Sequence, residues 1–150
     1  MKNSFFLIFF LVVTACGFKV VKSNYSQKYN ISEIVTSGEK RVNHIIKSKL
    51  LNLSKRDSDN KITINFDTKI EKVIKEKNIN NEITKYDIFV TINAELKDLR
   101  TQKVTKYATT KNGFYNVEEN NSSTRSNEKK LIILLSEDLI DELVVKINEI

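Results

Sequence analysis

Alternating apolar and polar residues between positions 85 and 97 limit what this chain can fold into more than any other feature. Because successive side chains of a β-strand point to opposite faces, the alternation predicts a long strand with one buried and one wet face. Phe89 is the one apolar residue on the polar side, and we expect it to contact a partner. The apolar set occupies even positions only: Tyr86, Ile88, Val90, Ile92, Ala94 and Leu96.

Further strands are predicted on both sides of this one. A second alternating run precedes it, with a break at Thr68, and Asn78-Ile79-Asn80-Asn81 is a turn signal between the two. Short strands are expected over residues 29–35 and 103–107, and an apolar patch follows a turn signal at Asn112-Gly113. The second run consists of Ile62, Ile64, Phe66 and Ile70, and the patch consists of Phe114, Tyr115 and Val117.

Two segments have helical spacing of their apolar residues. The first follows Ser37 as N-cap, and the second follows a polar, turn-like stretch over residues 120–127, with Ser126 or Asn127 as N-cap. The resulting order β-α-β-β-β-α predicts an α+β fold, a two-layer sandwich of two helices on one face of a mostly antiparallel four-stranded sheet. The first apolar stripe is Val42, Ile45, Ile46, Leu50 and Leu53, and the second is Ile132, Leu135, Leu139, Leu143, Ile147 and Ile150.

The first sixteen residues have the three parts of a bacterial export signal. Lys2 supplies a positive start, residues 5–13 are uniformly apolar, and the small residues Thr14 and Ala15 precede Cys16. The apolar run would rise only about 14 Å as a helix, too little for a bilayer core of about 30 Å. We expect residues 1–15 to be a cleaved signal peptide, residues 16–28 an acylated tether, and residues 29–150 a single α+β domain.

Cys16 is the only cysteine of the chain. Val13-Thr14-Ala15-Cys16 is similar to the lipobox of bacterial lipoproteins, in which the cysteine thiol takes up a lipid before cleavage. Two or three acyl chains give a durable membrane anchor, whereas one binds only marginally. The alternative is an ordinary secretory signal followed by an unrelated cysteine.

The charge of the chain is positive and unevenly distributed. The formal net charge is +6, but 21 of the 25 basic residues are lysines, so a nucleic-acid partner is not inferred from the charge alone. The final helix is net −3, whereas the last strands and their connection are net +3 and could bind lipid phosphates. A solvated strand that resists edge pairing is the plainer alternative. The candidate phosphate-binding residues are Lys85, Lys97, Arg100, Lys103, Lys106 and Lys111.

The sequence offers no catalytic or metal-binding constellation. His44 is the only histidine, and three glycines are too few for a phosphate-binding loop. The acidic residues of the final helix are expected on its solvated face rather than around a cation, and we expect neither a cofactor nor an enzymatic activity. These acidic residues are Glu137, Asp138, Asp141, Glu142 and Glu149.

The order of these features resembles a known family. Cys16-Gly17-Phe18-Lys19, the helix after a short strand, the long amphipathic strands, Phe114-Tyr115-Asn116 and the closing helix are similar to the lipopolysaccharide-assembly lipoprotein LptE in its alphaproteobacterial form. The family start carries a proline after the basic residue, where this chain has Val20-Val21. Its final helix is rich in alanine and arginine, whereas this one is rich in leucine, isoleucine and glutamate.

The resemblance implies a location and a role. Such a protein is anchored in the periplasmic leaflet of the outer membrane, plugs the lumen of the LptD β-barrel, and helps lipopolysaccharide to reach the cell surface. The resemblance also implies lipopolysaccharide binding through basic residues, without assigning their positions. The alternative function is a periplasmic lipoprotein that binds lipid or the subunits of another envelope complex.

Overall fold

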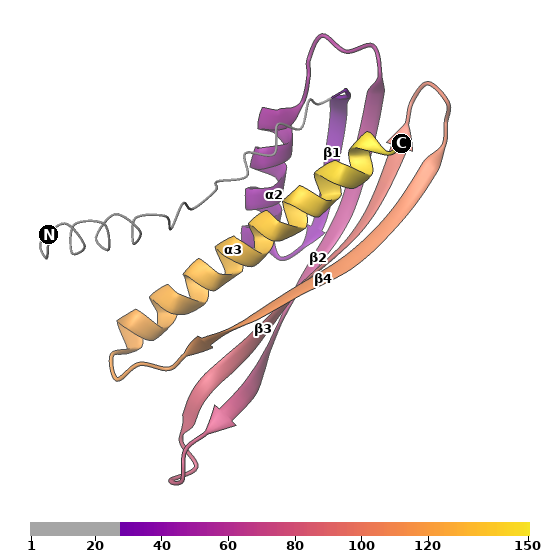
Figure 1. Ribbon diagram of the computed structural model, residues 1–150. Helices are drawn as coiled ribbons and strands as arrows, with labels where there is room; N and C mark the ends of the chain where they lie inside the picture. Colours follow the sequence, from indigo (N-terminus) through magenta and orange to yellow (C-terminus); the bar gives the residue numbers. More distant parts are fainter. Residues whose placement is uncertain (1–27) are drawn as a thin grey trace, which may run out of the picture.

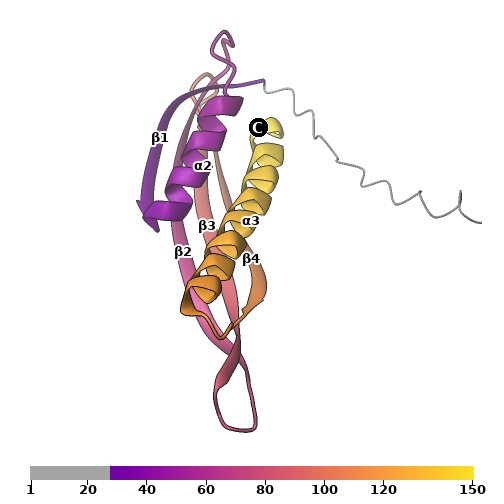
Figure 2. The same cartoon turned by 90° about the vertical axis from the view of Figure 1, so that its left-hand side faces the viewer.

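The computed structural model describes residues 28–150, which form two α-helices and one four-stranded sheet (Figure 1). In chain order the elements are β1 (Asn30–Gly38), α2 (Lys40–Leu53), β2 (Lys61–Lys77), β3 (Ile83–Asp98), β4 (Val104–Asn116) and α3 (Asn121–Asn148). Both helices lie on one face of the sheet (Figure 2). The predicted α+β fold is confirmed, whereas Cys16, the leader and residues 17–27 lie outside the described part.

The strand order β1-β2-β3-β4 brings distant segments to one end of the sheet. β1 and β2 are parallel, and α2 provides the crossover that parallel neighbours need. Asn30 and Lys61, the first residues of these strands, are therefore paired. Antiparallel pairing brings the end of β3 to the same place, where Leu99 N donates to Lys61 O at 2.9 Å.

The core lies between the sheet and the helices. Along β3 the even positions Ile88, Ile92 and Leu96 are fully buried, as the alternation predicts. They pack with residues from the buried stripe of α3, including Leu139 and Leu143. Neither of the two helices that the structure describes is long and apolar enough to cross a membrane.

Thr68 continues the buried face of β2 instead of breaking it. It is buried, and its Oγ1 donates to Asn43 Oδ1 of α2 at 2.7 Å. The amide of Asn43 donates in turn to Ser37 O at 2.9 Å. A hydroxyl can occupy a core position when its hydrogen bonds are satisfied. The sequence pattern does not show that Asn43 of α2 provides the acceptor.

The first helix does not begin at the predicted cap. Ser37 belongs to β1, and its Oγ donates to Asp67 Oδ1 on β2 at 2.7 Å. Glu39 holds the N-cap position without a side-chain capping bond, and its backbone N donates to Thr68 O at 3.0 Å. The bond to the neighbouring strand takes the place of a local cap.

The Asn112-Gly113 pair is not a turn. Both residues lie within β4, which is continuous to Asn116, and Gly113 pairs with Ile88. A Cβ at Gly113 would lie 2.8 Å from Leu131 Cδ1 of α3. The glycine therefore lets the helix approach the sheet closely. Close approach of another element is a common reason for a glycine within a strand.

Helix α3 begins earlier than its apolar stripe. Asn120 is its N-cap, and Asn120 Oδ1 accepts from Ser122 N at 2.8 Å. Ser126 and Asn127 lie inside the helix, so the predicted start was wrong. A polar first turn leaves no hydrophobic periodicity to read.

The β2–β3 hairpin extends well beyond β1, and we call its residues 69–87 the arm (Figure 1). β1 pairs with β2 only as far as Thr68. β2 continues to Lys77, and the chain turns at the predicted Asn78–Asn81 segment. Ile79 at the tip is fully exposed. At about 3.3 Å per residue, the tip lies about 50 Å from the opposite end of β3.

Candidate functional site

The turn between β3 and β4 positions two of the candidate phosphate-binding residues. The Asp98 carboxylate accepts from Arg100 N at 2.7 Å and Thr101 N at 3.0 Å, and the hydrogen bond from Thr101 is the main cause that lowers the pKa of Asp98. Gln102 has a φ of 59°, which completes the reversal. The buried aspartate thus fixes a turn on which Arg100 and Lys103 are exposed.

Four of the six candidates gather around this turn, namely Lys97, Arg100, Lys103 and Lys106. Lys106 lies opposite Glu95, with Nζ 3.9 Å from Glu95 Oε2. The first three have no ion pair within residues 28–150. The structure therefore supports a local group of cations rather than a six-residue site.

Lys85 and Lys111 lie elsewhere. Lys85 is twelve residues before Lys97 on β3, about 40 Å away at strand spacing, and it forms an ion pair with Glu76. Lys111 points to the helix side of β4 and forms an ion pair with Glu142 of α3. The two lysines were grouped with the others because they are close in sequence. Strand length separates Lys85 from the turn, and side-chain alternation directs Lys111 to the helix side of the sheet.

Three basic residues that sequence reasoning did not select join the turn. Lys55 and Arg56 follow α2, and Lys61 opens β2 beside Leu99. All three are exposed. The topology could have identified them, because a β-α-β crossover between parallel strands returns the chain to the end of the sheet where β1 begins. We call the resulting group the basic end, and it consists of Lys55, Arg56, Lys61, Lys97, Arg100 and Lys103.

Glu142 fastens α3 to β4 and does not lie on the solvated face of the helix. Its carboxylate accepts from Tyr107 Oη at 2.8 Å and Thr109 Oγ1 at 3.1 Å, and it also accepts from Lys111 Nζ. The hydrogen bond from Lys111, followed by that from Tyr107, lowers the pKa of Glu142 below its usual 4.5. Burial, with the hydrogen bond to Glu142, raises the pKa of Tyr107.

We expect Glu142→Gln to lower the free energy of unfolding at neutral pH and to flatten its decline in acid. The pKa of Glu142 is lower in the folded chain, so its stabilising effect is present above the ordinary value and lost as the pH falls through the folded value. Urea unfolding at about pH 7 and about pH 3 measures both effects. Glu137→Gln is the control, because Glu137 is exposed; equal behaviour of the two variants would contradict the assignment.

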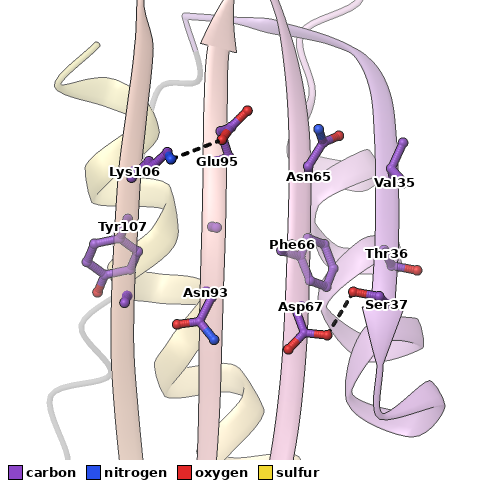
Figure 3. A pocket seen from close by; sticks show the side chains of 12 residues that line it. Val35, Thr36, Ser37, Asn65, Phe66, Asp67, Asn93, Glu95, Lys106 and Tyr107 are labelled. Carbon is purple, nitrogen blue, oxygen red and sulfur yellow. Dashed lines mark hydrogen bonds and ion pairs between the residues drawn. The ribbon is translucent and has the colours of Figure 1, made fainter.

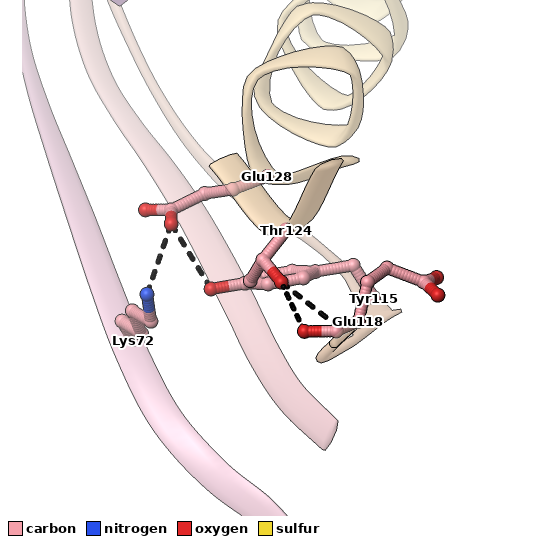
Figure 4. Close-up of polar contacts among 5 residues, drawn as sticks. All are labelled: Lys72, Tyr115, Glu118, Thr124 and Glu128. Carbon is pink, nitrogen blue, oxygen red and sulfur yellow. Dashed lines mark hydrogen bonds and ion pairs between the residues drawn. The ribbon is translucent and has the colours of Figure 1, made fainter. Parts of the chain in front are cut away.

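A second polar cluster joins the arm to the start of α3 (Figure 4). Lys72 Nζ lies 2.9 Å from Glu128 Oε2, which also accepts from Tyr115 Oη at 3.0 Å. Burial opposes the charge of Lys72, but hydrogen bonds with Tyr115 and Glu128 outweigh it and raise the pKa of Lys72. Lys72 also lies 4.2 Å from the ring centroid of Tyr86. This charge is neutralised internally, which gives the cluster a structural role.

The face of the sheet opposite the helices contains a shallow depression of about 610 Å³ that crosses all four strands (Figure 3). Its polar side chains include Asn65, Asn93 and Glu95, and the Ser37–Asp67 hydrogen bond lies at one side. Within residues 28–150 no group of three His, Cys, Asp or Glu residues is placed to hold a metal. Val35, which is 51% exposed, and Ala108 also line the depression, so the arrangement offers a broad contact surface of mixed polar and apolar character.

Comparison with known proteins identifies the fold. No family model and no curated protein matches the sequence. Among solved structures, the rare lipoprotein B from Shewanella oneidensis aligns over 78% of this chain and 91% of its own, at 11% identity and a TM-score of 0.51. The lipoprotein B from Nitrosomonas europaea aligns over 85% and 88%, at 11% identity and a TM-score of 0.52. This chain therefore has the fold of these bacterial lipoproteins.

Proposed function

We propose that this chain is an envelope lipoprotein, anchored through acyl chains on Cys16, that acts without catalysis as a plug and assembly factor for an LptD-type β-barrel in lipopolysaccharide transport. The observation that carries the proposal is the combination of a lipobox-like leader with the fold seen in bacterial lipoproteins. The anchor would hold the protein at the periplasmic leaflet of the outer membrane.

The open face of the sheet supports the role of a plug. The lumen of an outer-membrane barrel is polar, so a protein inside it needs a polar outer surface. On this face Thr91 Oγ1 and Thr110 Oγ1 are 2.8 Å apart across β3 and β4. Asn65, Asn93 and Glu95 line the depression, together with the exposed Val35 at its edge. The helices meanwhile cover the core on the other face, so the core itself closes without a partner.

The basic residues of the β3–β4 turn support contact with lipopolysaccharide. Arg100 and Lys103 are exposed, and neither forms an ion pair within residues 28–150. Phosphate groups accept strong charge-assisted hydrogen bonds from such side chains. Lipopolysaccharide is the phosphate-bearing ligand that the barrel role implies.

Affinity purification of the tagged, lipidated chain after crosslinking in cells tests the proposed function. We expect a large outer-membrane β-barrel to co-purify, and we expect depletion of the chain to reduce lipopolysaccharide at the cell surface. Recovery of the chain alone, with surface lipopolysaccharide unchanged, would overturn the barrel role. Recovery with a different envelope complex would instead support the alternative function.

The turn makes a narrower prediction. Arg100→Glu with Lys103→Glu should weaken binding to purified lipopolysaccharide by roughly tenfold, because two cationic donors are replaced by repelling charges. Lys129→Glu with Lys130→Glu is the control, since both lysines are exposed on α3 away from this turn. Surface plasmon resonance measures both, and equal losses would count against a localised site.

A further inference from the structure

The described chain starts at the basic end. Ser58 Oγ donates to Lys28 O, and Asn30 N donates to Asn60 O at 2.8 Å, so the first described residues lie against the loop that carries Lys55 and Arg56. The thirteen residues from Cys16 to Lys28 can span at most about 45 Å in any conformation. A lipid on Cys16 therefore holds this end of the sheet near the membrane, while the arm tip is about 50 Å further along β3.

Charge distinguishes the two ends of the sheet. Residues 55–61 and 97–103 together carry six basic and three acidic residues, and the carboxylate of Asp98 is taken up by its own turn. None of the six cations forms an ion pair within the described part of the chain. In the arm, by contrast, four of the five lysines pair with an acidic residue, and the fifth, Lys77, donates to Asn81.

Two exposed apolar side chains are close in sequence to some of these cations. Leu51 near the end of α2 is 48% exposed, and Val104 at the start of β4 is 45% exposed. Surfaces that rest on membranes combine basic residues, which attract anionic headgroups, with apolar side chains that enter the interface. Both kinds of group are present at the end to which the N-terminal segment connects.

We propose that the basic end rests on the anionic phospholipid headgroups of the membrane that holds the Cys16 anchor, with the arm directed away from that membrane. This inference rests on the lipid anchor of the proposed function, but not on a barrel or on lipopolysaccharide. The lipid alone permits any orientation that its tether can reach. Contact between the six unpaired cations of the basic end and the headgroups selects one of these orientations.

Fluorescence quenching on vesicles tests this orientation. The lipidated protein is labelled at Thr101→Cys in the β3–β4 turn or at Asn80→Cys at the arm tip, because the acylated Cys16 is not available to a thiol reagent. The vesicles contain phosphatidylcholine with or without phosphatidylglycerol, and a quencher attached to the headgroups. We expect the Thr101 label to be quenched only on vesicles with phosphatidylglycerol, and the Asn80 label to remain unquenched on both.

A charge-reversal variant provides the second arm of the test. Lys55→Glu, Arg56→Glu and Lys61→Glu should reduce quenching of the Thr101 label to its level on pure phosphatidylcholine. These three residues are not among the six lipopolysaccharide candidates. The matched control reverses one arginine and two lysines on α3, Arg125, Lys129 and Lys130, all of them exposed, and should leave quenching unchanged.

Several results would overturn the proposal, and three of them concern how quenching compares between labels, vesicles or variants. They are quenching of the Asn80 label at least as strong as that of the Thr101 label, equal quenching on neutral and anionic vesicles, and equal loss in the variant and its control. Flotation of the protein with the vesicles distinguishes failure of the proposed orientation from failure of the lipid anchor. Flotation without quenching at Thr101 refutes the orientation alone, whereas absence of flotation refutes the anchor, and the orientation with it.

Discussion

Replacing Cys16 by serine is expected to leave the protein without acyl chains and with residues 1–15 still attached. In the proposed anchor the cysteine sulfur takes up the lipid, and a serine hydroxyl is a much weaker nucleophile than a thiolate. With about 0.8 kcal/mol lost for each buried methylene group, removal of the acyl chains removes nearly all of the lipid contribution to membrane binding. Metabolic labelling with palmitate, and mass spectrometry of the N-terminus, measure the two effects.

Ser26→Ala in the tether is the control, because it changes a small polar residue without touching the lipobox-like segment. It should be labelled and cleaved like the unaltered chain. If Cys16→Ser were cleaved normally and secreted without lipid, the leader would be an ordinary secretory signal. The anchor, and the orientation inferred from it, would then be wrong.

Gly38→Ala should lower the free energy of unfolding by roughly 3 kcal/mol. Gly38 has a φ of +87°, and a Cβ there would lie 2.0 Å from Thr68 O. The neighbouring Glu39 N donates to that same carbonyl oxygen, so the strand cannot shift away without loss of the bond that starts α2. Urea unfolding of the mature chain measures the change, which is a large part of the 5–15 kcal/mol typical of a domain.

Gly113→Ala is the matched control, since it also places a methyl group in a tight space. Its nearest neighbour is the flexible end of Leu131, at 2.8 Å, and the glycine has no positive φ. We therefore expect a loss of less than about 1 kcal/mol. If the two variants lost similar stability, the backbone contact at Gly38 would not be the constraint that the structure indicates.

The sequence predicts the elements well wherever one face of an element is buried along its whole length. The even positions of β3 and the stripe of α3 are examples, because burial on one side of a regular backbone leaves a period that can be counted. The prediction fails where a polar residue has a distant partner or a glycine serves packing. Thr68 binds Asn43 across the layers, and Gly113 lies under Leu131, and neither partner can be read from its neighbours in the chain.

For the same reason, the sequence predicts only in part which of the candidate cations lie close together. Arg100 and Lys103 are close in sequence and remain close in space, whereas Lys85 and Lys111 are separated from them by strand length and strand face. Lys55, Arg56 and Lys61 are distant in sequence and join the site through the crossover. A list of charges along the chain holds neither kind of information.

The sequence by itself determined the lipobox-like leader, the α+β class and the order of the elements, because each depends on residues within a few positions of one another. Only the tertiary structure decided which cations share one end of the sheet, which are neutralised by acidic partners, and where the N-terminal segment joins the domain. These properties depend on strand pairing and on the direction of the crossover. Such contacts connect residues far apart in the chain, and local patterns do not encode them.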